Sequence, residues 1–469
     1  MPAQEQLNVA PGASAAAMAG VRGRDLWARG VATLKRSRRF LGPALLVSVG
    51  YMDPGNWGTD LQAGAQYQYA LLWVVALAGA MAIVLQLLAA RLGIVTGKNL
   101  AQACRDWYPK WCRLPLWIFC EIAIGACDLA EVLGSAVAIN LLFGTPILMA
   151  VLFTAADVLL LLILQKSGMR AIERVVVVLV LTIAGAFFVE LFVLPGTSLN
   201  LHEMGAALVH PSLAGAGMAS IAVAIIGATV MPHNLYLHSA LVQRSDADAD
   251  AEPAGGKASA NVALRLNAVS TVASLTMACL VNAAILLLAA KVFHGRSDIL
   301  VNGHRYVLGD DTDWLQLAYL TFTPALGTAV ASLIFAVALL ASGQSSTITG
   351  TLAGQVVMEG FTHWRLSPWK RRLMTRSLAI VPAVLIIGMR GDSSVNDLLI
   401  LSQVVLAMQL PFAMFPLLHF VTARRLMGNW PTPWSLLVLG WCSALAITAF
   451  DIVGLPGSVA DAARIVFGH

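Results

Sequence analysis

Long runs of apolar residues, separated by short polar segments, make up most of this sequence of 469 residues. Most of the runs are long enough for an α-helix to cross the hydrocarbon core of a bilayer, which takes about 20 residues. The pattern therefore predicts an all-α membrane protein with eleven transmembrane helices. The predicted helices cover residues 41–70, 71–95, 114–143, 146–165, 172–194, 213–242, 262–292, 314–342, 376–390, 394–421 and 432–452.

Basic residues are distributed unevenly among the segments that join the runs. The segments after the second, fourth, sixth, eighth and tenth runs contain Lys or Arg, whereas those after the first, third and fifth contain neither. The seventh segment mixes basic and acidic residues. Because Lys and Arg accumulate in cytoplasmic loops, the alternation predicts a cytoplasmic N-terminus and a C-terminus outside.

The composition agrees with this picture. Hydrophobic residues make up 58% of the chain and charged residues 12%, about half the charged share of an average soluble domain. The net charge of +5 is explained by the basic loops, so no nucleic-acid partner is expected. Six cysteines without a C-x-x-C pair favour reduced, packed thiols. Residues 1–40 are predicted to be a disordered, basic cytoplasmic tail, because no apolar segment typical of a signal peptide precedes Leu41.

The first apolar run is interrupted by the sequence Asp53-Pro54-Gly55-Asn56. Proline removes a backbone donor and clashes with the preceding turn, and a carboxylate at bilayer depth costs about 3 kcal/mol on insertion scales. A membrane helix tolerates such a break only where its backbone faces protein or a water-filled cavity. We therefore interpret the break as part of a binding site.

The sixth run contains a second break, at Met231-Pro232-His233. Each break lies in the first run of a set of five, and these two runs cross the membrane in opposite directions. Broken helices at matching positions of inverted repeats are typical of secondary transporters with a site at the midplane. The expected divisions are a first repeat over residues 41–194, a second over 195–421 with a cytoplasmic linker at 243–260, and an additional helix with a tail over 422–469.

The two prolines predict which backbone carbonyls lack a helical partner. The N–H of residue i normally bonds the carbonyl of residue i−4, so Pro232 frees the carbonyl of Ala228 and Pro54 frees that of Gly50. With the Asp53 carboxylate and the Asn56 amide oxygen, such carbonyls suit a hard cation. The Met231 sulfur favours Mn²⁺, Fe²⁺ and other transition metals over Mg²⁺ and Ca²⁺. A single methionine in a membrane helix usually serves as adaptable packing, and a single proline usually only kinks the helix. The joint pattern of the two breaks favours a metal site.

At these residues the sequence resembles the NRAMP family of proton-coupled divalent metal transporters. The resemblance runs from about Arg39 to the end of the tenth run, and it includes the segments at 235–239, 343–355, 358–361, 402–405 and 409–412, as well as Arg371-Arg372 and Thr375-Arg376. It implies a LeuT-like fold of five plus five helices with broken helices 1 and 6, and import of Mn²⁺ or Fe²⁺ with protons across a bacterial inner membrane. It also implies that Asp53, Asn56, Ala228 and Met231 hold the metal, which is substrate rather than a permanently bound cofactor. We expect a protein that functions as a monomer in the lipid bilayer.

One stretch of the sequence differs from the residues that are usual in the family at the same positions. Trp57-Gly58-Thr59-Asp60 follows the first break where relatives have Phe-Ala-Thr-Asn or a similar sequence. Asp60 lies one turn beyond Asn56 on the same helical face. It either adds negative charge near the outer mouth or only extends toward the interface, which leaves the detailed ion preference open. The magnesium-transporting relatives lack the methionine, so Met231 argues against that branch.

Proton coupling needs ionisable groups that the metal does not use. Glu121, Asp128 and Glu131 share one face of the third predicted helix, and the resemblance gives Asp128 the proton-accepting role and Glu131 the next step. A structural alternative is that these acids only bond the broken backbone. Arg371, Arg372 and Arg376 are either topology anchors or partners of these acids, and the family makes Arg372 the first choice.

Further polar residues near the breaks are candidates for gating or relay. His233 and His238 titrate near neutral pH and suit a relay, although a membrane histidine is often only a hydrogen-bonding residue. Gln403 and Asn282 are oxygen donors in apolar runs that either join the metal shell or bond between helices. Residues expected to support or gate the site are Gly50, Pro54, Gly55, Asp60, Gln86, Thr229, Pro232 and Asn282.

Other functions remain possible from the sequence. An amino-acid symporter of the same fold would direct half-helix N-termini at a substrate carboxylate, for which Asp53 and Met231 are unsuited. An intramembrane metalloprotease would need a zinc motif such as H-E-x-x-H, which is absent, so no enzyme activity is expected. Two broken helices and a chain of acids favour a coupled transporter over a channel.

Overall fold

The computed structural model describes only part of the chain: residues 47, 50–156, 178, 185, 200–215, 217–243, 256–301, 304–309, 312–326, 329–362, 366–392 and 394–467. Within it, eight helices are long and apolar enough to cross a membrane. The predicted tail 1–40, the end of the predicted span 146–165 from residue 157 on, most of the predicted span 172–194 and most of the linker 243–260 lie outside the described residues. The count of eleven spans and the repeat boundaries therefore stay predictions.

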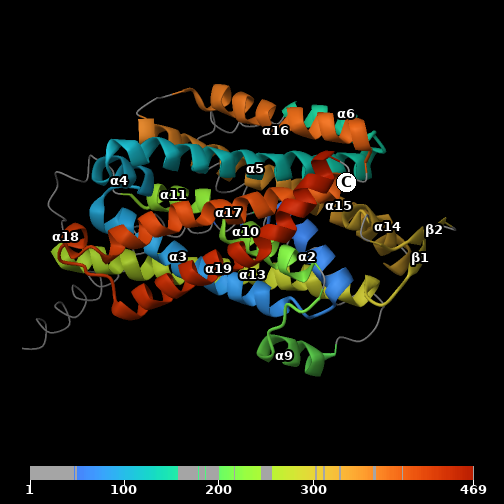
Figure 1. Cartoon of the computed structure of the whole chain (residues 1–469), viewed down its shortest axis with the longest axis horizontal. Coiled ribbons are helices and arrows are strands. Elements are labelled where there is room, and N and C mark those ends of the chain that lie inside the picture. Colours follow the sequence, from blue (N-terminus) through green and yellow to red (C-terminus); the bar gives the residue numbers. More distant parts are fainter. Residues whose placement is uncertain are drawn as a thin grey trace, which may run out of the picture.

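The described chain is nearly all helical, and most of its long helices run side by side (Figure 1). The short helices α4 and α18 lie at one end of the bundle, and the strands β1 and β2 lie at the opposite end. The elements are α2 (Pro54–Tyr67), α3 (Leu72–Thr96), α4 (Leu100–Trp107), α5 (Lys110–Phe143), α6 (Ile147–Phe153), the 3₁₀ turn η1 (Thr154–Ala156), α9 (Leu201–Val209), α10 (Met218–Val230), α11 (Pro232–Leu241), α13 (Gly256–Phe293), β1 (Asp298–Val301), β2 (His304–Val307), α14 (Trp314–Leu326), α15 (Ala329–Thr362), α16 (Pro368–Arg390), α17 (Ser394–Thr422), α18 (Arg424–Met427) and α19 (Trp434–Phe467).

Both predicted breaks are present. Helix α2 begins at Pro54, where proline is tolerated because the first helical position needs no intrahelical N–H bond, and Asp53 caps it. In the sixth span, α10 ends at Val230 and α11 begins at Pro232. Met231 joins them with φ 32° and ψ 107°, a backbone conformation that is uncommon for a residue with a side chain. The chain therefore leaves the helical path at the positions that the prolines indicate.

The eighth predicted span is placed wrongly. Residues 314–342 do not form one helix: α14 ends at Leu326, and the membrane-spanning part of the next helix covers Leu333–Thr362. The polar segment 343–355 thus lies inside a span. The span tolerates its Ser and Thr hydroxyls because they bond neighbouring helices and their own backbone, as Ser346 and Thr349 show. Apolarity alone cannot reveal such a span.

Several other boundaries differ from the prediction. Helix α16 starts at Pro368 instead of 376, and α19 extends to Phe467 instead of 452. The segment after the seventh span forms an antiparallel hairpin in which Asp298 pairs with Val307. Apart from this hairpin, the prediction of an all-α membrane protein is confirmed.

Small residues bring the helices into close contact around the first break. A Cβ atom on Gly134 of α5 would lie 2.1 Å from Cβ of Pro54, and one on Gly64 of α2 would lie 2.1 Å from the carbonyl oxygen of Leu286 in α13. A Cβ atom on Gly227 of α10 would lie 2.0 Å from the carbonyl oxygen of Gln403 in α17. Such close approaches are how membrane helices gain packing contacts. They hold α2, α5, α10, α13 and α17 around one centre.

Candidate functional site

Asp53 lies at the N-terminus of α2 and is fully buried. Its Oδ1 atom accepts hydrogen bonds from the backbone N of Asn56 at 2.9 Å and from Asn56 Nδ2 at 2.8 Å. An acidic side chain is favourable at this position, because it satisfies a free N–H group and complements the positive end of the helix dipole. Its Oδ2 atom is buried and accepts no hydrogen bond within the described chain, so half of the carboxylate is available to a ligand.

The carbonyl of Ala228 lies opposite Asp53 across the two breaks. It accepts a hydrogen bond of 3.1 Å from Asn56 Nδ2, the same nitrogen that donates to Asp53 Oδ1. Two oxygens from different halves of the chain thus converge on one point. The Asn56 oxygen, which the sequence predicts as a ligand, points elsewhere: Oδ1 accepts from Asn282 Nδ2 at 3.0 Å and from Thr229 Oγ1 at 3.4 Å.

Met231 is buried in the second break, next to the first. Its Sδ atom accepts a hydrogen bond of 3.4 Å from Asn234 Nδ2. The same Asn234 nitrogen lies 2.6 Å from the position that a Cβ atom of Gly50 would take. Asn234 therefore connects the Met231 thioether to the chain before α2, a role that the sequence analysis did not assign to it.

Gln403 approaches the first break from α17. A Cβ atom on Gly55 would lie 2.2 Å from Gln403 Nε2, so only glycine at position 55 leaves room for this side chain. Gln403 Nε2 donates to Ser402 Oγ at 2.8 Å, and its buried Oε1 accepts no hydrogen bond within the described chain. The structure thus brings Gln403 beside the first break, together with Asp53, Asn56 and Ala228.

This centre differs from a resident metal site. Among the described residues, no group of three or more His, Cys, Asp or Glu side chains is placed to hold a metal ion. The converging donors are instead one carboxylate, amides, a backbone carbonyl and a thioether. A site with few charged ligands can bind a transition metal and still release it.

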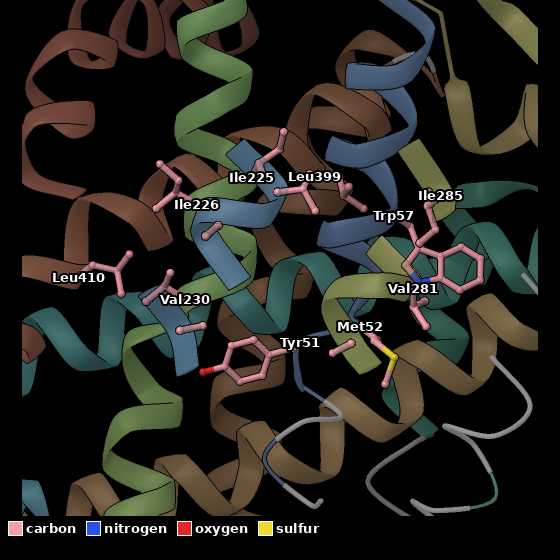
Figure 2. Packing of buried hydrophobic residues seen from close by; sticks show 14 of the residues in the cluster. Tyr51, Met52, Trp57, Ile225, Ile226, Val230, Val281, Ile285, Leu399 and Leu410 are labelled. Atoms are coloured by element: carbon pink, nitrogen blue, oxygen red, sulfur yellow. The ribbon is translucent and has the colours of Figure 1, made fainter. Parts of the chain in front are cut away.

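Apolar side chains enclose the centre. Figure 2 shows Tyr51 near Val230 of α10, and Val281 and Ile285 of α13 beside the indole of Trp57; all are buried. The backbone carbonyl of Met52 accepts a hydrogen bond from Ser342 Oγ of α15. The polar centre is therefore shielded from water on these sides, which strengthens electrostatic interactions within it.

A second polar cluster lies between α5 and α16. The Arg372 guanidinium bonds the Asp128 carboxylate through Nη1, and its Nη2 donates to Glu131 Oε2 at 3.1 Å. Arg376 Nη1 lies 3.8 Å from Glu131 Oε2. All four side chains are buried. The predicted pairing of Arg372 with these acids is present, so these arginines are not merely topology anchors.

Glu131 has further partners on α15. Its Oε1 accepts from Ser346 Oγ and its Oε2 from Thr347 Oγ1, both at 2.9 Å, and Cys127 Sγ lies 3.5 Å from Oε1. In the sequence, Ser346 and Thr347 lie in the segment 343–355, which carries part of the family resemblance. The available signal was the run of hydroxyl residues Ser345-Ser346-Thr347, but that signal needed the correct boundary of this span.

Glu121 forms a separate pair. Its Oε2 accepts from Arg371 Nη2 at 2.7 Å, and its Oε1 accepts from Trp117 Nε1 at 2.8 Å. The carboxylate is one-quarter exposed, whereas Arg371 is buried. The three acids that share one face of α5 therefore all have arginine partners on α16.

The two histidines of α11 have different surroundings. His238 Nδ1 lies 2.8 Å from Gln86 Oε1 and its Nε2 lies 3.2 Å from Asn267 Oδ1, while Gln86 Nε2 donates to Tyr51 Oη at 2.6 Å. This chain joins α11 to α3, to α13 and to the first break. His233 is buried, and its Nδ1 has no hydrogen-bond partner within the described residues.

Asp60 does not extend toward the membrane surface. Only 1% of its surface is exposed, so the alternative in which it reaches the interface is excluded. Its Oδ2 atom is buried and accepts no hydrogen bond within the described chain. Asp157 and Glu190, which carry no predicted role, lie outside the described residues.

Comparisons with known proteins agree with this architecture. The family model "Natural resistance-associated macrophage protein-like" (Nramp) matches residues 44–455. Two curated relatives, from Xanthomonas campestris pv. campestris and Mesorhizobium japonicum, are both named divalent metal cation transporter MntH and are both 46% identical to this chain. The alignments cover 96% of this chain and 97% of the Xanthomonas protein, and 89% of this chain and 88% of the Mesorhizobium protein.

Solved structures give the same result. A crystal structure of the Eremococcus coleocola manganese transporter is 36% identical, with a TM-score of 0.77, over 91% of this chain and 88% of that one. At 14% identity and a TM-score of 0.55, MHP1 of the nucleobase-cation-symport-1 family shares the fold over 91% of each chain. The predicted LeuT-like fold is thus confirmed, and these relatives are transporters rather than enzymes. With a family model that matches most of its length and relatives of this identity, the chain belongs to the Nramp family.

Proposed function

We propose that this protein imports divalent transition-metal ions, Mn²⁺ or Fe²⁺, into the bacterial cytoplasm together with protons, by alternating access across the inner membrane. The observation that carries the proposal is the convergence of Asp53 Oδ1 and the Ala228 carbonyl on one nitrogen, at 2.8 and 3.1 Å. The oxygens come from breaks in opposite halves of the chain. A cation held between them would respond to movement of either half.

The ligand chemistry supports a transition metal as substrate. When the metal enters, Asn56 turns its amide over, so that Oδ1 joins Asp53 and the Ala228 carbonyl while Nδ2 faces Thr229. The Met231 sulfur adds a soft ligand, which Mn²⁺ and Fe²⁺ accept more readily than Mg²⁺ or Ca²⁺. Gln403 Oε1, which is buried without a partner among the described residues, completes the shell when the site closes.

Protons take a separate route in this proposal. Asp128 accepts the proton and passes it to Glu131, and Arg372 lies between them and stabilises whichever carboxylate is ionised. Glu121 and Arg371 continue the route toward the cytoplasmic end of α5. His233 and His238 on α11 relay or gate it. The protein functions as a monomer in this proposal.

The runner-up function, an amino-acid symporter, fits the geometry less well. The N-terminus of α2, where a substrate carboxylate would bind in such a transporter, is already capped by the Asp53 carboxylate. A second carboxylate would meet like charge there.

Uptake into proteoliposomes tests the metal assignment. With an inward proton gradient we expect uptake of Mn²⁺ and Fe²⁺ but little uptake of Mg²⁺ or Ca²⁺. Met231→Ala should admit Ca²⁺ while keeping Mn²⁺ uptake, because only the soft ligand is lost. Unchanged selectivity in Met231→Ala would refute the role of the sulfur.

Proton coupling has its own test. Asp128→Asn should still bind Mn²⁺, because Asp53 and Ala228 are intact, but metal uptake should no longer acidify the lumen. Normal acidification by this variant would remove Asp128 from the proton route without contradicting metal transport.

A further inference from the structure

The buried charges of α5 and α16 balance one another. Three carboxyl groups, those of Glu121, Asp128 and Glu131, face three guanidinium groups. The ion pairs are Arg371 with Glu121, Arg372 with Asp128 and Glu131, and Arg376 with Glu131. No carboxylate in this region needs a mobile cation as its partner.

Helix α2 lacks such a balance. Asp53 and Asp60 are both buried, and the Oδ2 atom of each accepts no hydrogen bond within the described chain. No Lys, Arg or His of the described residues forms an ion pair with either acid. Burying a carboxylate without a compensating charge is costly, so a cation that arrives beside these two acids and compensates their charge is favoured.

Asp60 is close enough to Asp53 and Asn56 for its charge to act at the transport site. It lies one turn beyond Asn56 on the same face of α2, about 6 Å along the helix axis. Asp53 and Cys279 of α13 are titratable groups close enough to interact electrostatically with it.

In the part of the chain that the structure describes, no Lys, Arg or His of the other helices packed against α2 forms an ion pair with Asp60. Helix α10 contains no titratable residue, and the α17 side chains that Cβ atoms on Gly55 and Gly58 would meet, Gln403, Leu399 and Asn396, are uncharged. On α5, the residue that lies against Pro54 at this approach, Gly134, carries no charge. Among the described residues, Asp53 is the acid whose charge acts on Asp60.

We propose that Asp60 is a second carboxylate of the transport site, which does not touch the metal but balances the second positive charge of a divalent cation bound at Asp53. The inference rests on the proposed function. One ligand carboxylate and one remote carboxylate match an ion of charge two, whereas Asp53 alone would leave one positive charge uncompensated in an apolar surrounding. Asp60 thereby raises the affinity for divalent over monovalent cations.

Equilibrium binding of Mn²⁺ to the purified full-length protein in detergent, followed by the electron paramagnetic resonance signal of free Mn²⁺, tests this inference. Asp60→Asn keeps the shape and removes the charge, and should weaken Mn²⁺ binding about tenfold. Asp60→Glu restores the charge and should return the affinity to within about threefold of the original. A merely structural role would not be restored by the longer side chain.

Asp451→Asn is the matched control. Asp451 of α19 also has two buried oxygens without partners in the described chain, but it is not among the groups whose charge acts on Asp53 or Asp60. Its variant should bind Mn²⁺ as the original does. An equal loss in Asp451→Asn and Asp60→Asn would show a general effect of buried acids and overturn the inference.

Two further outcomes separate the inference from the proposed function. If Asp53→Asn abolishes binding while Asp60→Asn binds normally, or if Asp60→Glu binds as weakly as Asp60→Asn, the charge-balancing role is refuted and the transport site stands. If the original protein does not bind Mn²⁺, or Asp53→Asn binds it unchanged, the proposed function itself fails.

Discussion

The acids of α2 and those of α5 lie in one helical bundle, yet only the acids of α5 have fixed cations as partners. Asp128 and Glu131 share Arg372, and Glu131 also receives bonds from Ser346 and Thr347. Asp53 keeps one oxygen without any partner in the described chain. The two regions use the same side chain type in opposite electrostatic settings.

This difference indicates which cation, a proton or a metal ion, each region can bind and release. A carboxylate bonded to a guanidinium has its negative charge balanced by the protein itself. It can lose a proton and take it up again, because the arginine stabilises the ionised form inside the bundle. A carboxylate without a fixed cation favours any cation that arrives. The contrast supports the proposal in which the α5–α16 region carries protons and the α2–α10 region holds the metal ion.

Removing the fixed cation should have the largest effect on stability. Arg372→Met leaves Asp128 and Glu131 buried with less compensation, and we expect a loss of about 3–5 kcal/mol in unfolding free energy. Thermal unfolding in detergent measures it. Arg425→Met, in an exposed position on α18, should change little. Adding Asp128→Asn and Glu131→Gln to Arg372→Met should recover much of the loss, and failure to do so would show that packing rather than charge is responsible.

Removing the unpaired acid should have a different effect. Asp53→Asn keeps a good helix cap and should unfold no more easily than the original protein without metal. The original should gain about 2.7 kcal/mol from Mn²⁺ at 100 times its dissociation constant, and the variant should gain none. Asp128→Asn, in contrast, should keep this gain but unfold more easily without metal. If the two variants behaved alike, the distinction between the regions would be wrong.

The contact between the two regions should be sensitive to a single methyl group. Gly134→Ala places a Cβ atom 2.1 Å from Cβ of Pro54, and proline cannot move aside easily. Overpacking of this kind costs about 1–3 kcal/mol. Gly125→Ala on the same helix meets no atom within 4 Å and should stabilise the protein by up to about 1 kcal/mol through helix propensity. Thermal unfolding of the pair compares the two, and equal stabilities would mean that α2 and α5 can separate freely.

An exposed ion pair should have the smallest effect. Lys98 Nζ and Arg105 Nε lie 2.6 and 2.9 Å from the Asp106 carboxylate at the end of the bundle that contains α4. Partial burial alone would raise the pKa of Asp106, but the hydrogen bonds and charges of Lys98 and Arg105 lower it overall. The ion pairs of Asp106 therefore stabilise the fold when the pH is above the usual carboxyl pKa. This stabilisation is lost as the pH falls through the lowered pKa of Asp106.

Asp106→Asn measures that contribution. We expect a loss of less than about 0.5 kcal/mol at neutral pH, which disappears in acid, where the original carboxyl is also neutral. Thermal unfolding across a pH series measures it. A loss as large as that of Arg372→Met would show that burial does not determine the strength of these ion pairs.

The sequence alone determined the features that depend on local chemistry. Proline at 54 and 232 sets where the helices break, because a missing N–H and a fixed φ act on the adjacent turn whatever surrounds it. The release of the Ala228 carbonyl follows from the same local rule. The shared face of Asp128 and Glu131 follows from helix periodicity.

Only the tertiary structure decided the features that depend on which helices meet. The pairing of Arg371 with Glu121 and of Arg372 with Asp128 depends on the rotation of α16 against α5, which periodicity does not define. The orientation of the Asn56 amide depends on Thr229 and Asn282, both far away in sequence. The burial of Asp60 requires α10 and α13 to cover α2. Each is a contact between distant segments, and the free energy that selects it comes from packing the whole bundle rather than from any one stretch of sequence.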